Sequence, residues 1–149
     1  MHMRQNEANR QFRKAVQRYR DAVQRVHILQ QQKKEIAYRA SGVHAVRFER
    51  QGSRTYDPLL WIEKNTVNQQ KISECMRQMD TFESMMSMID ASAACLLWQV
   101  YIDHMTWKQA AENLGMSRDA AFRRCYRSIV YLFEQGMLKA EELPVGIDS

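Results

Sequence analysis

WKQAAENLGMSRDAAFRRCYRSI, from Trp107 to Ile129, is the stretch that decides the C-terminal fold of this 149-residue chain. It has the layout of two helices joined by a tight turn. Ala111 supplies the small residue that close helix crossing requires, Gly115 supplies a residue free to adopt positive φ, and Ser117 is a good N-cap. With Thr106 as the cap of the first helix, the stretch predicts a helix-turn-helix.

The second of these helices, expected over about residues 118–135, has a buried stripe and a basic face. Its apolar residues recur at steps of four, four and three: Ala121, Cys125, Ile129 and Leu132. Leu114 and Met116 are expected to flank the turn and fix the crossing angle. The arginines fall largely outside the stripe, and a basic helix in this position is typical of one that contacts duplex DNA.

The ten candidate DNA-contacting residues follow from this arrangement. We expect the groove-facing surface to consist of Gln109, Arg118, Asp119, Ala120, Arg123 and Arg124. Lys108 and Arg127 are better placed for phosphates, while Thr106 and Ser117 present helix N-termini to the DNA backbone. An ordinary helical hairpin with solvated arginines is the competing interpretation.

The rest of the chain predicts an all-α fold with a long helical arm over residues 1–90. One helix is expected over about 6–40, with a heptad seam, and another begins at Asp57-Pro58 with a second seam. The two seams consist of Phe12, Val16, Tyr19, Val23 and Val26, and of Ile72, Cys75, Met79, Phe82, Met86 and Ile89. These helices fold into an antiparallel hairpin or pair between molecules as a coiled coil, and both alternatives stay open.

The connections and the C-terminal part complete the expected layout. Ser41-Gly42 is expected to end the first helix, and a basic connector over 43–57 follows, with room for an extended piece at 43–48. A shorter helix capped by Asp90 is expected over about 91–103. The DNA-binding unit then covers 91–136, with Gly136 ending its last helix, and 137–149 is a flexible tail.

Charge is unevenly distributed along the chain, whose net charge is +5. Residues 1–57 hold 13 Lys and Arg against 5 Asp and Glu, whereas residues 106–149 hold 6 of each. The N-terminal arginines are either the solvated face of a helix or a second nucleic-acid contact, because neutralising phosphates releases counterions regardless of sequence.

The residue types that form catalytic or metal sites in other proteins show no such spacing in this sequence. The three cysteines are widely spaced and fall within predicted helices, which favours small buried thiols in a reducing cytoplasm. None of the four histidines has a metal-ligand spacing, and no nucleophile motif or phosphate-binding loop occurs. We therefore expect no metal, no cofactor, no catalytic residue and no enzyme activity, and no membrane segment or signal peptide.

Residues 91–135, through LLWQVYIDHMTWKQAAENLGMSRDAAFRRCYRSIVYL, resemble the promoter-reading fourth region of bacterial sigma factors. The whole arrangement resembles small phage regulators of late genes, the RinA and ArpU families. Ala110 and Ala121 depart from the family pattern, which usually has larger aliphatic residues there. The resemblance implies a transcriptional regulator that binds promoter DNA, with an arm that dimerises or contacts RNA polymerase.

Two other functions remain open from the sequence. A small terminase-like subunit of phage DNA packaging also joins a helix-turn-helix to helical oligomerisation segments. A helical protein-binding adaptor would use the same helices without contacting DNA.

Overall fold

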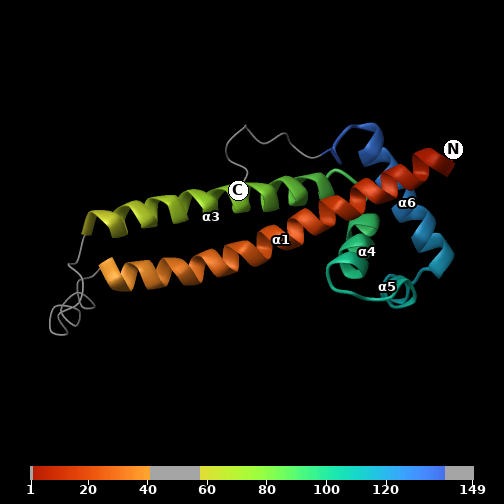
Figure 1. The fold of residues 1–149 in the computed structure, drawn as a ribbon. Coiled ribbons are helices and arrows are strands. Elements are labelled where there is room, and N and C mark those ends of the chain that lie inside the picture. The colour runs from red at the N-terminus through yellow and green to blue at the C-terminus, as the bar shows by residue number, and fades with distance from the viewer. Residues whose placement is uncertain (1, 41–57, 140–149) are drawn as a thin grey trace. The chain divides into compact units, whose positions relative to one another are not determined.

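The computed structural model describes residues 2–40 and 58–139, which form five helices and no strand. The all-α expectation is therefore confirmed for this part of the chain (Figure 1). Ser41-Gly42, the 43–57 connector with its extended piece, Asp57 and the tail from residue 140 lie outside the described residues. The helices are α1 (His2–Ala40), α3 (Pro58–Met86), α4 (Ala91–Tyr101), α5 (Trp107–Asn113) and α6 (Arg118–Glu134).

The chain forms two compact units, and both long helices contribute to each of them. One unit combines residues up to Arg20 with those from Thr81 onward, and the other comprises residues 21–80. The boundary expected at residue 90, between a helical arm and a DNA-binding unit, stays a prediction. No sequence pattern indicated that the first half of α1 packs with the C-terminal helices.

In the unit of residues 21–80, α1 and α3 run in opposite directions and bury a shared row of side chains (Figure 1). The prediction that Val23 belongs to the first seam is wrong, because its side chain is 40% exposed. Ala22, three residues after Tyr19, is fully buried in its place, because it packs in the cluster with Ile72 and Cys75 of α3. The core of this unit consists of Ala22, Val26, Leu29, Ile72 and Cys75, with Met79 packed against it.

The second expected seam is mostly buried, but its last expected member, Ile89, does not belong to it. Phe82 and Met86 are buried, whereas Ile89 lies beyond the end of α3. The cause is local: the backbone N–H of Ser87 donates to the carbonyl oxygens of Glu83 and Ser84, and these bonds close the last turn. The chain is then free to turn at Asp90, whose carboxylate accepts from the N–H of Ala93 and caps α4.

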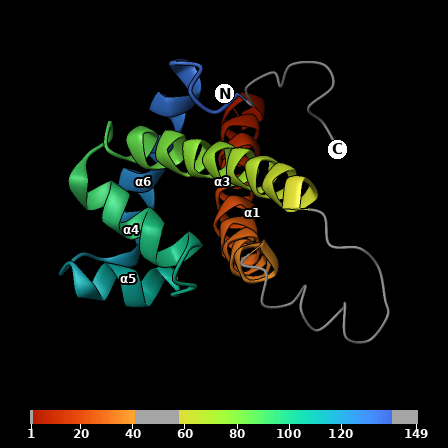
Figure 2. The same cartoon turned by 90° about the vertical axis from the view of Figure 1, so that its left-hand side faces the viewer.

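In the unit of residues 2–20 and 81–139, the three short helices pack on one another (Figure 2), and the first half of α1 contacts α4 and the end of α3. Aromatic rings make this contact. Phe12 meets the ring of Tyr101 edge-on, with centroids 5.3 Å apart, and Tyr19 stacks on Phe82 at 4.6 Å. Leu96, Leu97 and Leu132 are almost fully buried in the same unit.

Two of the N-terminal arginines have partners outside α1 in this unit. Arg18 donates from Nη2 to the carbonyl oxygen of Leu138 at 3.3 Å. Arg20 donates from Nη2 to Nε2 of His104 at 3.0 Å. These two side chains therefore tie α1 to the chain on either side of α5 and α6, a role that neither interpretation of the basic N-terminus included.

Candidate nucleic-acid interface

The N-termini of α5 and α6 are capped as the sequence predicts. Thr106 Oγ1 accepts from the N–H of Gln109 at 3.1 Å, and Gln109 Oε1 accepts in return from the N–H of Thr106 at 3.2 Å. Ser117 Oγ accepts from the N–H of Ala120 at 3.1 Å. These bonds satisfy backbone donors that a helix start leaves unpaired. The amide oxygen of Gln109, a predicted groove residue, is thus engaged in a cap.

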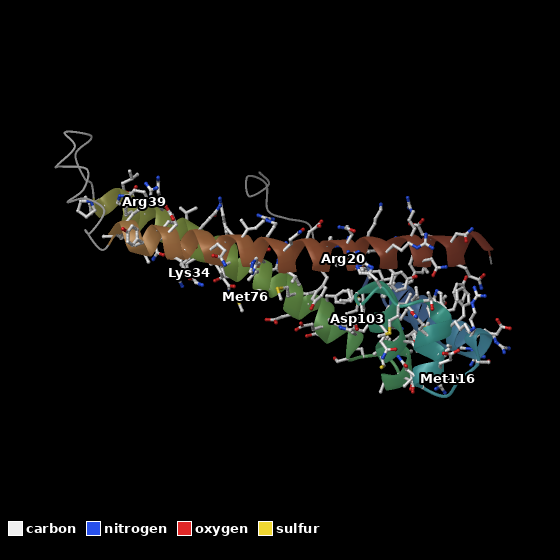
Figure 3. The ribbon with its side chains drawn as sticks, turned by 90° about the horizontal axis from the view of Figure 1, so that it is seen from below. Arg20, Lys34, Arg39, Met76, Asp103 and Met116 are labelled. Atoms are coloured by element: carbon white, nitrogen blue, oxygen red, sulfur yellow. The ribbon has the colours of Figure 1, made fainter. Side chains whose placement is uncertain are left out.

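A tight turn over residues 114–117 joins α5 to α6. Gly115 has φ +66°, as its place in the pattern predicts. The N–H of Met116 donates to the carbonyl oxygen of Ala111 at 3.0 Å, which closes the turn on α5. Figure 3 marks Met116 on this turn. Leu114, expected to flank the turn and fix the crossing angle, flanks the turn but is 36% exposed.

Gly115→Val is expected to lower the free energy of unfolding by about 1–2 kcal/mol, the cost of a left-handed conformation for a residue with a Cβ. A Cβ at this position would have no heavy atom within 4 Å beyond its chain neighbours, so the cost comes from the backbone alone. Gly115→Asn is the control, because asparagine tolerates positive φ. Urea unfolding of the two variants measures the difference, and equal stability would contradict the role of the glycine.

Small and apolar side chains hold α5 against α6. Ala110 and Ala111 are buried on α5, and Ala121 is buried on α6. The predicted stripe of α6 is confirmed, since Ala121, Cys125, Ile129 and Leu132 are all buried. Ser128 is buried beside them, which the pattern missed. The buried stripe fixes which face of α6 is left for solvent.

All ten predicted site residues are exposed, but only some of them lie together. Arg123, Arg124 and Arg127 line one surface hollow of about 290 Å³, with Met116 and Ala120 as the other lining residues. Lys108 and Gln109 are on α5, while Ser117, Arg118 and Asp119 form the start of α6; none of these lines the hollow. The arrangement is a cluster of three arginines beside two apolar side chains, Met116 and Ala120.

The three arginines of the hollow are not equivalent. Arg123 follows the buried Ala121 by two positions, about 200° around the helix, so it points away from the core. Arg127 follows one turn later on nearly the same side. Arg124 lies on the flank, where its Nε is 3.6 Å from Oδ2 of Asp90, the cap of α4. Because of this pair, Arg124 presents less net positive charge than its two neighbours.

Aromatic residues that the sequence analysis missed connect α5 to α6. Trp107 contacts Phe122 edge-on at 5.3 Å, and Phe122 stacks on Tyr126 at 6.0 Å. Tyr101 of α4 also meets Trp107 edge-on, with ring centroids 6.3 Å apart. The four-residue spacing of Phe122 and Tyr126 was the available signal. These rings fix the start of α5 against the middle of α6.

Cys125 gives the unit a pH dependence. Burial raises the pKa of its thiol from 9.0 to about 12. Below pH 9 the thiol is neutral in both folded and unfolded chains, and above it only the unfolded chain ionises, so stability falls as the pH rises toward 12. Alkaline unfolding should therefore be less steep in Cys125→Ala than in wild type. Cys95→Ala, at a half-buried thiol, is the control; identical profiles for both variants would contradict the prediction.

Within residues 2–40 and 58–139, no group of His, Cys, Asp and Glu side chains is arranged to hold a metal ion. None of the helices in the same ranges is long and apolar enough to cross a bilayer. Comparison of the chain with known protein families, with curated proteins and with solved structures finds no match.

Proposed function

We propose that the protein is a transcriptional regulator that binds duplex DNA sequence-specifically, with α5 and α6 as a helix-turn-helix. One observation carries the proposal: Arg123, Arg124 and Arg127 surround a single exposed hollow on α6, the helix that follows the turn at Gly115. The second helix of such motifs lies in the major groove, where its exposed side chains reach base edges. An arginine there can donate two hydrogen bonds to guanine.

The positive charges of α6, on its arginines and at its N-terminus, support binding of an extended anion such as a DNA backbone. In the described part of the chain, no carboxylate lies within ion-pair distance of Arg118, Arg123 or Arg127. Arg123 Nε donates only to the carbonyl oxygen of Asp119, at 3.4 Å, so most of its donors stay available. The capped N-terminus of α6 adds its own partial positive charge at Ser117. A DNA backbone passing this helix end would meet favourable charge from both sources.

Binding to a labelled duplex over a salt series tests the proposal. Selection from a random duplex pool first supplies a preferred sequence, and a scrambled duplex serves as its competitor. We expect tighter binding to the preferred duplex and a log–log decrease in affinity with salt. For the arginine variants of α6, such as Arg123→Ala, the charge-matched control is Arg77→Ala. It removes one exposed arginine from α3, in the other unit. Binding that is insensitive to salt, or equal on both duplexes, would contradict sequence-specific regulation.

The same measurements separate the other two functions. A packaging subunit would assemble into rings and show little sequence preference, and a protein-binding adaptor would show no salt-dependent affinity for DNA. The regulation of phage late genes, contact with RNA polymerase and a cytoplasmic site of action extend the proposal on the strength of the sigma-factor resemblance. Mapping of bound DNA across the host and phage genomes tests the first of these extensions.

A further inference from the structure

A groove runs between α1 and α3 in the unit of residues 21–80. Its volume is about 380 Å³. Leu29, Ile36, Leu60 and Val67 provide its apolar walls. Val67 is 49% exposed and Leu60 is 43% exposed, so two large side chains of the groove face solvent within the single chain. Leu60 and Val67 are seven residues apart, which places them on one face of α3.

The groove also contains a buried amide with an unmet hydrogen bond. Asn68 is only 5% exposed, and its Nδ2 donates to the carbonyl oxygen of Leu29 at 3.1 Å. Its Oδ1 has no partner among the residues of the structure. A buried acceptor without a partner costs about 1–3 kcal/mol. Because Oδ1 has almost no exposed surface, this cost stays within the 21–80 unit, and a docking molecule would gain from covering the apolar walls.

We infer that a second copy of the chain docks in this groove, with the two α3 helices antiparallel about a two-fold axis at Val67. Glu63 and Lys71 both line the groove, four residues before and four residues after Val67. The two-fold axis brings Glu63 of one copy level with Lys71 of the partner subunit, and the pair occurs twice. The groove is thus complementary in charge to itself, which favours a second copy over an unrelated partner.

The neighbouring side chains leave this pair available. The ammonium of Lys64 lies over the ring of Trp61, 4.5 Å from its centroid. Glu74 is engaged by Arg77 at 2.6 Å. No residue of the described helices forms an ion pair with Glu63 or Lys71. The inferred interface uses only residues of the 21–80 unit, so it stands independently of DNA binding.

Sedimentation of the full chain without DNA tests the interface. We expect a dimer of the 17.6 kDa chain in the wild type, and Val67→Asp should raise the dissociation constant on the order of 100-fold by placing two carboxylates on the axis. Met76→Asp is the matched control, since Met76 is also on α3 and also 49% exposed. Met76 and Lys34, both labelled in Figure 3, line a different hollow. Circular dichroism verifies that both variants are folded.

Charge reversal tests the register. Glu63→Lys and Lys71→Glu each create like-charge contacts across the axis, and each should weaken the dimer on the order of tenfold at low salt. The double variant restores opposite charges and should return the affinity close to that of wild type. The inference is overturned by a wild-type monomer at high concentration, by equal effects of Val67→Asp and Met76→Asp, or by a double variant no tighter than the single ones.

Discussion

Phe82→Ala is expected to lower the free energy of unfolding by about 3–5 kcal/mol, the range for deleting a buried phenylalanine side chain. Phe82 is 6% exposed, and its ring stacks on Tyr19 and lies 6.1 Å from the ring of Trp98. Truncation would leave a cavity between α1, α3 and α4 in the unit that carries the candidate interface. Urea unfolding followed by tryptophan fluorescence measures the loss, because Trp98 borders the site.

Phe122→Ala is the matched control for this prediction. Phe122 is 48% exposed, although its ring also contacts two aromatic neighbours, Trp107 and Tyr126. Losing these ring pairs should cost about 0.5–1.5 kcal/mol each at most. An unfolding midpoint of Phe82→Ala that matches that of Phe122→Ala would mean that the end of α3 does not pack on α1 in solution.

The second large effect is expected at the arginines of α6, which should separate into two classes. Arg123 points directly away from the core, and a base contact made by it is worth about 1–3 kcal/mol of discrimination. Arg123→Ala should therefore relax the preference at one base pair. In the proposed binding mode Arg127, a turn further from the N-terminus of α6, contacts a phosphate. Arg127→Ala should weaken all sequences evenly and lower the salt slope by about 1.

Arg124 should behave differently from Arg123, although the sequence analysis grouped the two. Its guanidinium lies beside the Asp90 carboxylate, so part of its charge is already compensated. We expect Arg124→Ala to change DNA affinity less than Arg123→Ala does. Titration of preferred and scrambled duplexes over a salt series compares the three variants. If none of the three changes affinity or selectivity, α6 does not contact DNA and the adaptor function is favoured.

The local signals of the sequence predicted the C-terminal helices well. Asp90, Thr106 and Ser117 cap their helices, and Gly115 and Gly136 adopt positive φ. Each of these features depends on residues within one helical turn, and capping chemistry is therefore visible in a short window of sequence. The same holds for the buried stripe of α6, which follows from helical periodicity.

Features that depend on distant residues were not predictable in this way. Val23 fits a heptad pattern as well as Ala22 does, and only the packing of α3 against α1 decides between them. The pairing of Arg124 with Asp90 joins residues from different helices, as does the contact of Trp107 with Phe122. The unmet acceptor of Asn68 likewise appears only when α1 and α3 are placed together.

The packing of the first half of α1 with the last three helices has a consequence for how the protein is made. A ribosome makes residues 2–20 long before residues 81–139, yet these segments form one compact unit. Closing so long a loop costs entropy that local helix formation does not repay, which slows folding. During synthesis Phe12 and Tyr19 are therefore without their aromatic neighbours until Phe82, Trp98 and Tyr101 have been added to the chain.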